Sequence, residues 1–139
     1  MRLILDASVA AKWFNVEELS DKAVAVKDAY VKGSIELAAP VHIIYEVGNS
    51  VWKNEQLARN DAVDAVTSLL LLAIQLLNPN VKRVSRTMEI AKLKGTTFYD
   101  ASYIQAAEEL DIPLLTADEH QISTAKGIAK VIHLKEFKT

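Results

Sequence analysis

The chain begins with an apolar run that ends in an acid, Leu3-Ile4-Leu5-Asp6-Ala7-Ser8-Val9-Ala10. Apolar residues in succession, without a polar alternate, are typical of a strand that is buried on both faces of a sheet. The small and apolar residues that follow, up to Phe14, favour a helix. A buried strand that runs directly into a helix is half of a β-α-β unit and therefore predicts a parallel sheet.

The same alternation of strand and helix continues along the chain. We expect helices at 21–31, from Pro40 along an apolar stripe to 51, at 59–74, from about 84 to Gly95, at 99–110 and from 118 to about 127, and strands at 35–38, 75–77, 113–116 and 131–134. The apolar run at 69–77 is expected to be buried. Strands separated by helices predict a parallel sheet covered on both faces, with right-handed crossovers.

Length and composition point to one globular domain that spans residues 1–139, with 50% hydrophobic and 24% charged side chains. The 16 basic and 18 acidic side chains give a formal charge of -2, so no global positive field indicates a nucleic-acid binder. The lack of cysteine excludes a disulfide framework and a thiolate zinc site, and it favours an intracellular, cytoplasmic protein. No signal peptide is expected, and no apolar run approaches the roughly 20 residues of a membrane span.

Acidic side chains follow two of the expected strands. Asp6 ends the first strand, and Asp118 follows the strand at 113–116 within two residues. In parallel sheets the carboxyl ends of the strands form the edge where ligands bind. Asp100 lies in the first turn of its expected helix, and Glu46 lies beside an apolar stripe on another helix. We expect these four carboxylates to converge on one pocket.

Four converging acids repel one another, and burial raises their pKa values unless cations supply the missing charge. Oxygen-only donors favour Mg²⁺ or Mn²⁺ over zinc or copper. The three histidines, at 42, 120 and 133, lack metal-ligand spacing and are expected to be ordinary surface or core residues. A cation of this kind polarises a phosphoryl group and activates a bound water, which is the chemistry of phosphodiester hydrolysis. Ser8, Asn49 and Thr116 lie close to three of the acids and are candidates to orient them.

Other interpretations explain each acid separately. Asp6 and Asp118 are acceptable N-caps, Asp100 is an acceptable first-turn acid, and Glu46 has Lys53 as a candidate partner. One shared cause is simpler than four separate ones. The sequence also contains a basic cluster, which comprises Lys82, Arg83, Arg86, Lys92 and Lys94. This cluster is either a solvated face or a track for a phosphate backbone.

Four stretches resemble the motifs of the PIN-domain nucleases, and within them the VapC-type toxins of prokaryotic toxin-antitoxin pairs. They are 5–9 with 12–14 and 17–18, Pro40 through Glu46 to Asn49, Phe98-Tyr99-Asp100-Ala101 with Tyr103, and Leu115-Thr116-Ala117-Asp118. Their order and spacing agree from residue 1 to about 134. One departure is Gln121, which stands about where the family often places an apolar residue.

The resemblance implies a three-layer α/β/α sandwich around a parallel sheet. It also implies Mg²⁺- or Mn²⁺-dependent endonucleolytic cleavage of RNA at an acidic site made of Asp6, Glu46, Asp100 and Asp118, with support from Ser8, Asn49 and Thr116. Toxins of this family usually form homodimers, and a cognate antitoxin silences them by covering the acidic pocket.

The sequence leaves three alternatives to a toxin ribonuclease open. They are a housekeeping RNA-processing nuclease of the same fold, a non-catalytic binding module that keeps the acids, and a receiver-like domain that accepts a phosphoryl group on an aspartate. The receiver-like alternative leaves Glu46 unexplained, and no strand ends in the adjacent acidic residues that such domains usually have.

Overall fold

A computed structural model describes residues 1–138 and contains one five-stranded parallel sheet. The strands are β1 (Arg2–Leu5), β2 (Glu36–Pro40), β3 (Gln75–Leu77), β4 (Leu114–Thr116) and β5 (Val131–His133). Their order across the sheet is β3-β2-β1-β4-β5, and neighbouring strands pair in parallel. The chain thus moves outward from β1 to one edge and then returns to the other side of β1. The order reverses between β1 and β4, which is where sheets of this type bind ligands.

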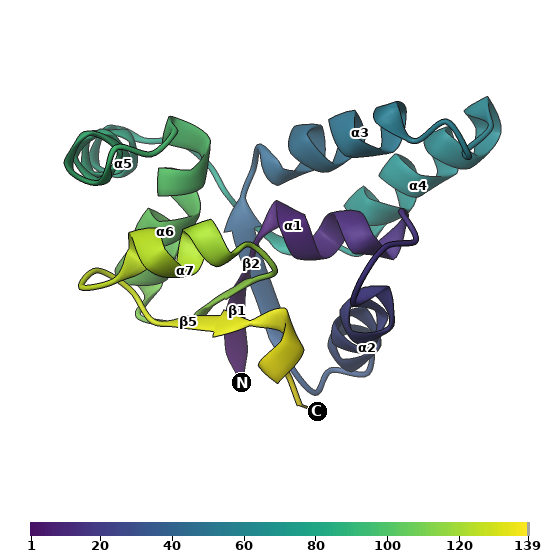
Figure 1. The fold of residues 1–139 in the computed structure, drawn as a ribbon, viewed down its shortest axis with the longest axis horizontal. Coiled ribbons are helices and arrows are strands. Elements are labelled where there is room, and N and C mark those ends of the chain that lie inside the picture. Colours follow the sequence, from purple (N-terminus) through teal and green to yellow (C-terminus); the bar gives the residue numbers. More distant parts are fainter. Residues whose placement is uncertain (139) are drawn as a thin grey trace.

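Helices cover both faces of the sheet. They are α1 (Ala7–Ala10), which continues into the 3₁₀ turn η1 (Ala11–Trp13), α2 (Ser20–Val31), α3 (Ile43–Lys53), α4 (Arg59–Leu71), α5 (Val81–Lys94), α6 (Phe98–Leu110), α7 (Glu119–Ala125) and the 3₁₀ turn η2 (Leu134–Glu136). Figure 1 shows α1 to α4 on one side of the sheet and α5 to α7 on the other. The expected three-layer α/β/α arrangement is confirmed.

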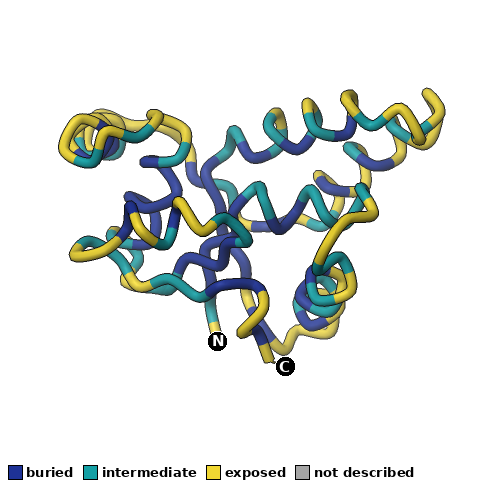
Figure 2. Tube along the Cα trace, viewed as in Figure 1, coloured by how far each residue is buried: buried dark blue, intermediate teal, exposed yellow. Residues whose placement is uncertain are grey.

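The core is built on the two central strands. Leu3, Ile4 and Leu5 of β1 and Leu114 and Leu115 of β4 have no exposed surface. Figure 2 shows these strands as the buried centre of the molecule, with exposed segments at the outer helices. Because both faces of these strands are covered, they carry apolar residues in succession rather than in alternation. This packing holds the carboxyl ends of β1 and β4 rigidly side by side.

The expectation that Pro40 opens a helix is wrong. Pro40 is the last residue of β2, and α3 begins three residues later at Ile43. Pairing of β2 with β1 ends at Ala38, while Val41 N donates to Leu77 O of β3. A proline at position 40 therefore costs no ladder hydrogen bond toward β1, and its fixed φ suits a strand end as well as a first helical turn.

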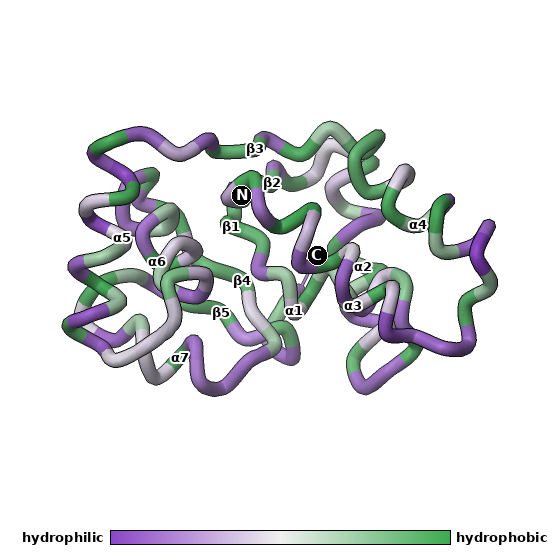
Figure 3. Tube along the Cα trace, turned by 90° about the horizontal axis from the view of Figure 1, so that it is seen from above, coloured by the Kyte–Doolittle hydropathy of each residue, from purple (hydrophilic) through white to green (hydrophobic). Residues whose placement is uncertain are grey.

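The helix expected at 59–74 is also shorter than the apolar run suggested. The helix α4 ends at Leu71, Ala73 adopts a left-handed φ of 55°, and the chain enters β3 at Gln75. Leu70 and Leu71 are 58% and 77% exposed, so the run is not buried throughout. Figure 3 shows α4 at the outside of the fold, with stretches coloured as hydrophobic along its trace. The short strand at 75–77 is confirmed.

Within residues 1–138 no helix is both long and apolar enough to cross a membrane.

Candidate active site

Two aspartates lie where the order of the sheet reverses. Asp6 follows β1 directly, and Asp118 follows β4 by two residues. The two acids differ as helix caps: Asp118 Oδ1 accepts a 2.9 Å hydrogen bond from His120 N, whereas the side chain of Asp6 makes no cap bond to α1. Capping therefore accounts for Asp118 in part, and it does not account for Asp6.

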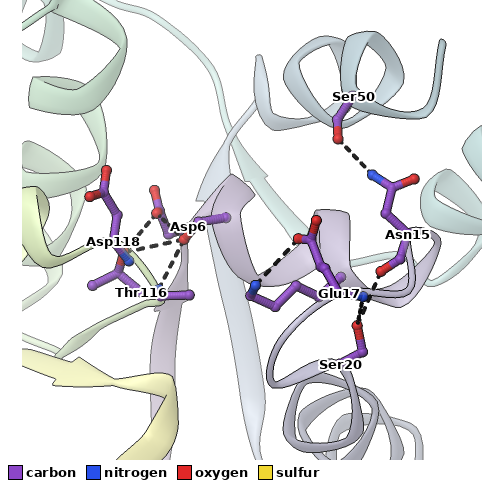
Figure 4. Close-up of polar contacts among 10 residues, drawn as sticks. Asp6, Asn15, Glu17, Ser20, Ser50, Thr116 and Asp118 are labelled. Carbon is purple, nitrogen blue, oxygen red and sulfur yellow. Dashed lines mark hydrogen bonds and ion pairs between the residues drawn. The ribbon is translucent and has the colours of Figure 1, made fainter. Parts of the chain in front are cut away.

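Two hydroxyls hold the carboxylate of Asp6 in one orientation. Ser8 Oγ donates to Asp6 Oδ2 at 2.6 Å, and Thr116 Oγ1 donates to the same oxygen at 2.8 Å. In turn, Ser8 Oγ accepts from Ala117 N at 3.0 Å, and Thr116 Oγ1 accepts from Asp118 N at 3.0 Å. Figure 4 shows Asp6, Thr116 and Asp118 close together where the two strands end. Within the described chain no hydrogen bond reaches Oδ1 of Asp6, so this oxygen keeps its capacity to bind a ligand.

The Asp6 carboxylate is buried without a compensating positive charge. It is 5% exposed, and burial raises its pKa from 3.8 to about 6. This value also includes two smaller effects: the hydrogen bonds from Ser8 and Thr116 lower the pKa, and the negative charges of Asp100 and Glu46 raise it. Because Asp100 and Glu46 affect Asp6, these three acids share one electrostatic environment.

Replacing Ser8 tests this account of Asp6. The Ser8→Ala variant is expected to have an Asp6 pKa above about 6, because one donor to Oδ2 is lost while burial is unchanged. Carboxyl ¹³C NMR titration measures this value directly, and Ser123→Ala, at an exposed serine of α7, is the matched control. An Asp6 pKa that stays equal or falls in Ser8→Ala would contradict the assignment.

Asp100 lies in the first turn of α6, where two contacts position its backbone. Thr97 Oγ1 accepts from Asp100 N at 3.1 Å, and Gln121 Nε2 donates to Asp100 O at 3.1 Å. Gln121 is fully buried, so the polar residue that departs from the family pattern ties α7 to this turn of α6. Burial raises the pKa of Asp100, and the charges of Asp118 and Glu46 raise it further. The charges of Glu46, Asp100 and Asp118 therefore each affect the pKa of Asp6 or of Asp100, which links the four predicted acids electrostatically.

Two side chains that the sequence did not place there lie against Glu46. His42 Nδ1 lies 2.6 Å from Glu46 Oε1, and Tyr103 OH donates to the same oxygen at 3.3 Å. Burial and the neighbouring acids raise the pKa of Tyr103, so its hydroxyl remains a proton donor. The other ring nitrogen of His42 lies 2.6 Å from Ser102 Oγ.

The contact between His42 and Glu46 could have been predicted from the sequence. His42 and Glu46 are four residues apart, which places them on one face of a helical turn. We expected His42 to be an ordinary surface or core residue and considered Lys53 as the partner of Glu46; instead, Lys53 is exposed at the end of α3. Asn49 lies one turn beyond Glu46 and is exposed, and no hydrogen bond within residues 1–138 joins its side chain to the acids.

Two arginines of the basic cluster have structural partners. Arg83 pairs with Glu109 at 3.0 Å, and Arg86 pairs with Glu108 at 2.8 Å, so both join α5 to α6. The pKa values of both glutamates are lowered by these arginines. Because these two arginines are already paired, the five basic residues do not together form a track for a phosphate backbone.

The acidic site offers the donor chemistry of a hard divalent cation. Its side chains present carboxylate oxygens and, at Ser8 and Thr116, hydroxyl oxygens, which suit Mg²⁺ or Mn²⁺. Among residues 1–138 no three acids or histidines are gathered in a ready ligand cluster. Burial and the neighbouring acids raise the pKa values of Asp6 and Asp100, and a bound cation would offset both effects by neutralising the negative charge. The residues present therefore fit such an ion.

Known proteins share the sequence pattern and the fold of this chain. The sequence profile of the PIN domain matches residues 3–127. Ribonuclease VapC3 of Pyrobaculum aerophilum is 32% identical over 123 residues, 85% of this chain and 90% of that protein. Exonuclease VapC9 of the same organism is 36% identical over 107 residues, 75% of this chain and 78% of that protein. A toxin-antitoxin complex from Klebsiella pneumoniae contains a chain of the same fold, with a TM-score of 0.66 at 14% identity, covering 97% of this chain and 99% of that one.

Proposed function

Because this chain belongs to the PIN-domain family, we propose that it is a metal-dependent endoribonuclease and the toxin component of a toxin-antitoxin pair. The observation that carries the proposal is the buried carboxylate of Asp6, whose pKa is raised to about 6 beside two further acids. A purely structural role would not require a buried charge without a cationic partner. The similarity to a protein named as a ribonuclease supports RNA as the substrate.

The four acids have two roles in the proposed site. Asp6, Asp100 and Asp118 hold the cation, Mg²⁺ or Mn²⁺, and Glu46 completes its ligands or orients the attacking water. A cation bound by these residues would polarise the phosphoryl group and would lower the pKa of a bound water. Ser8 and Thr116 keep Oδ1 of Asp6 available by occupying Oδ2, while Tyr103 and His42 restrain Glu46.

Two protein partners follow from the same family. We propose a cognate antitoxin that covers the acidic pocket, as the resemblance to VapC-type toxins implies, and a homodimer of this chain. Asn49 is proposed to contact the substrate or the antitoxin rather than the carboxylates, because it is exposed beside them on α3.

Cleavage of circular RNA tests the proposal. The purified protein is expected to open a circular RNA and to cut a linear RNA pool with Mg²⁺ or Mn²⁺, and to do neither in EDTA. Degradation of linear RNA from its ends while circles stay intact would show an exonuclease, the activity in the name of VapC9. Intact RNA under every condition, from protein shown by mass spectrometry to carry no bound inhibitor, would reject a nuclease.

A further inference from the structure

An apolar cleft lies between α5 and α6. Its volume is about 220 Å³, and its walls include Val84 of α5, Phe98 of α6 and Pro79 from the segment that precedes α5. It is also lined by Pro40 and Leu77, the last residues of β2 and β3. The cleft therefore opens at the same edge of the sheet as the acidic site.

The cleft and the acidic site share a wall. His42 and Ser102 line the cleft, and His42 Nδ1 also lies 2.6 Å from Glu46 Oε1. Phe98 is the first residue of α6, two positions before Asp100. His42 therefore borders the cleft and also contacts one of the acids, Glu46.

The lining of the cleft favours a flat, uncharged group. Phe98 and Val84 are 40% and 39% exposed, so the cleft presents apolar surface to water. Arg83 lies at its edge, but its Nη2 pairs with Glu109 at 3.0 Å and its Nη1 donates to Asn78 O at 2.8 Å. With its guanidinium engaged in this way, Arg83 is not set up to bind a phosphate inside the cleft.

We propose that this cleft receives an unpaired nucleobase of the RNA substrate, adjacent to the phosphodiester that is cut. The inference rests on the proposed ribonuclease function and adds a substrate subsite to it. Proteins that recognise single-stranded RNA commonly stack unpaired bases on aromatic side chains, and Phe98 offers such a ring at the mouth of the cleft. Because every base has a π-face, stacking of this kind gives affinity with weak sequence preference.

Abasic substitution in the substrate tests the subsite. A short RNA with one mapped cut site is prepared intact and with an abasic nucleotide at each of three positions on either side of the cut. Single-turnover cleavage by the wild-type protein is expected to slow on the order of 10-fold or more at one position only, the size expected for the loss of one base stack.

A variant of the aromatic wall separates this role from a structural one. Phe98→Ala is expected to slow cleavage of the intact RNA by a similar factor. The variant and the wild-type protein should cut the sensitive abasic RNA at the same rate, because that RNA already lacks the base that would stack on Phe98. Leu93→Ala is the matched control, since Leu93 is 71% exposed on α5 and does not line the cleft. It should leave both rates unchanged.

Three results would overturn the proposal. Equal rates on all abasic RNAs would show that no base is bound beside the cut. Equal slowing of intact and abasic RNA by Phe98→Ala, together with a change from dimer to monomer in sedimentation velocity, would show that the cleft binds another protein chain. Cleavage of no RNA at all by the wild-type protein would reject the ribonuclease function and the subsite with it, whereas the first two results leave that function standing.

Discussion

Asp100→Asn is expected to lower the rate of RNA cleavage by a factor on the order of 10³, because a metal-held transition state loses several kcal/mol of stabilisation without this carboxylate. The substitution is isosteric, and two of the contacts that position this turn of α6 involve the backbone of Asp100. The fold is therefore expected to remain intact. Removal of one acid from a repelling group also means that the metal-free variant should be no less stable than the wild-type protein.

The matched control for this experiment is Asp111→Asn, at the opposite end of the same helix. Asp111 is exposed and has a left-handed φ of 52°, a conformation that asparagine tolerates well. The measurement is single-turnover cleavage with Mn²⁺, together with thermal unfolding of each protein in EDTA. Full activity of Asp100→Asn at matched metal would remove this residue from the site, and a clearly lower melting temperature would show that its role is structural.

Asp6→Asn is expected to stabilise the metal-free protein at pH 8 by up to about 3 kcal/mol. The folded-state pKa of Asp6 is about 6, compared with 3.8 for the ordinary side chain, and each unit corresponds to about 1.4 kcal/mol. The folded state binds the proton more tightly than the unfolded state does. The contribution of Asp6 to stability is therefore fully present below pH 3.8 and is lost as the pH rises through about 6.

An asparagine suits the local contacts. Its carbonyl oxygen accepts from Ser8 and Thr116 as Asp6 Oδ2 does, and its amide group then takes the place of Oδ1. Urea unfolding in EDTA at pH 4 and pH 8 measures the effect as the difference between variant and wild type, which is expected to be larger at pH 8. A difference that does not depend on pH would show that Asp6 is not buried as an uncompensated acid.

Divalent cations are expected to make the wild-type protein more stable than Asp6→Asn, the reverse of the order in EDTA. Mn²⁺ binds the native wild-type site and is expected to raise its melting temperature as the concentration increases, because ligands that bind only the folded state stabilise it. Asp6→Asn should lose this response together with cleavage activity. An equal response to Mn²⁺ in both proteins would place the metal elsewhere.

The architecture of the fold was predictable because it depends on patterns that are local in the chain. Apolar runs such as 3–5 and 113–116 have the form of strands covered on both faces, and the helices between them require a parallel sheet. Acids at the ends of two such strands must then meet at one edge. Asp6 and Asp118 were identified for this reason, without any knowledge of the strand order.

Features that depend on packing were not predictable in the same way. The exposure of Leu70 and Leu71 follows from the end of α4 and the turn at Ala73, which apolar periodicity does not reveal. The pairing of Arg83 with Glu109 joins two helices whose alignment no short-range pattern specifies.

The sequence by itself determined the class of fold and the acids that meet at the carboxyl edge of the sheet, since burial of a strand and the direction of the chain are encoded within a few residues. Only the tertiary structure decided how each acid is held. Ser8 and Thr116 converge on one oxygen of Asp6 from α1 and from the end of β4, and His42 and Tyr103 reach Glu46 from the start of α3 and from α6. The contact of Thr116 with Asp6 spans 110 residues of chain and that of Tyr103 with Glu46 spans 57, so these partners become neighbours only when the sheet and its helices pack together.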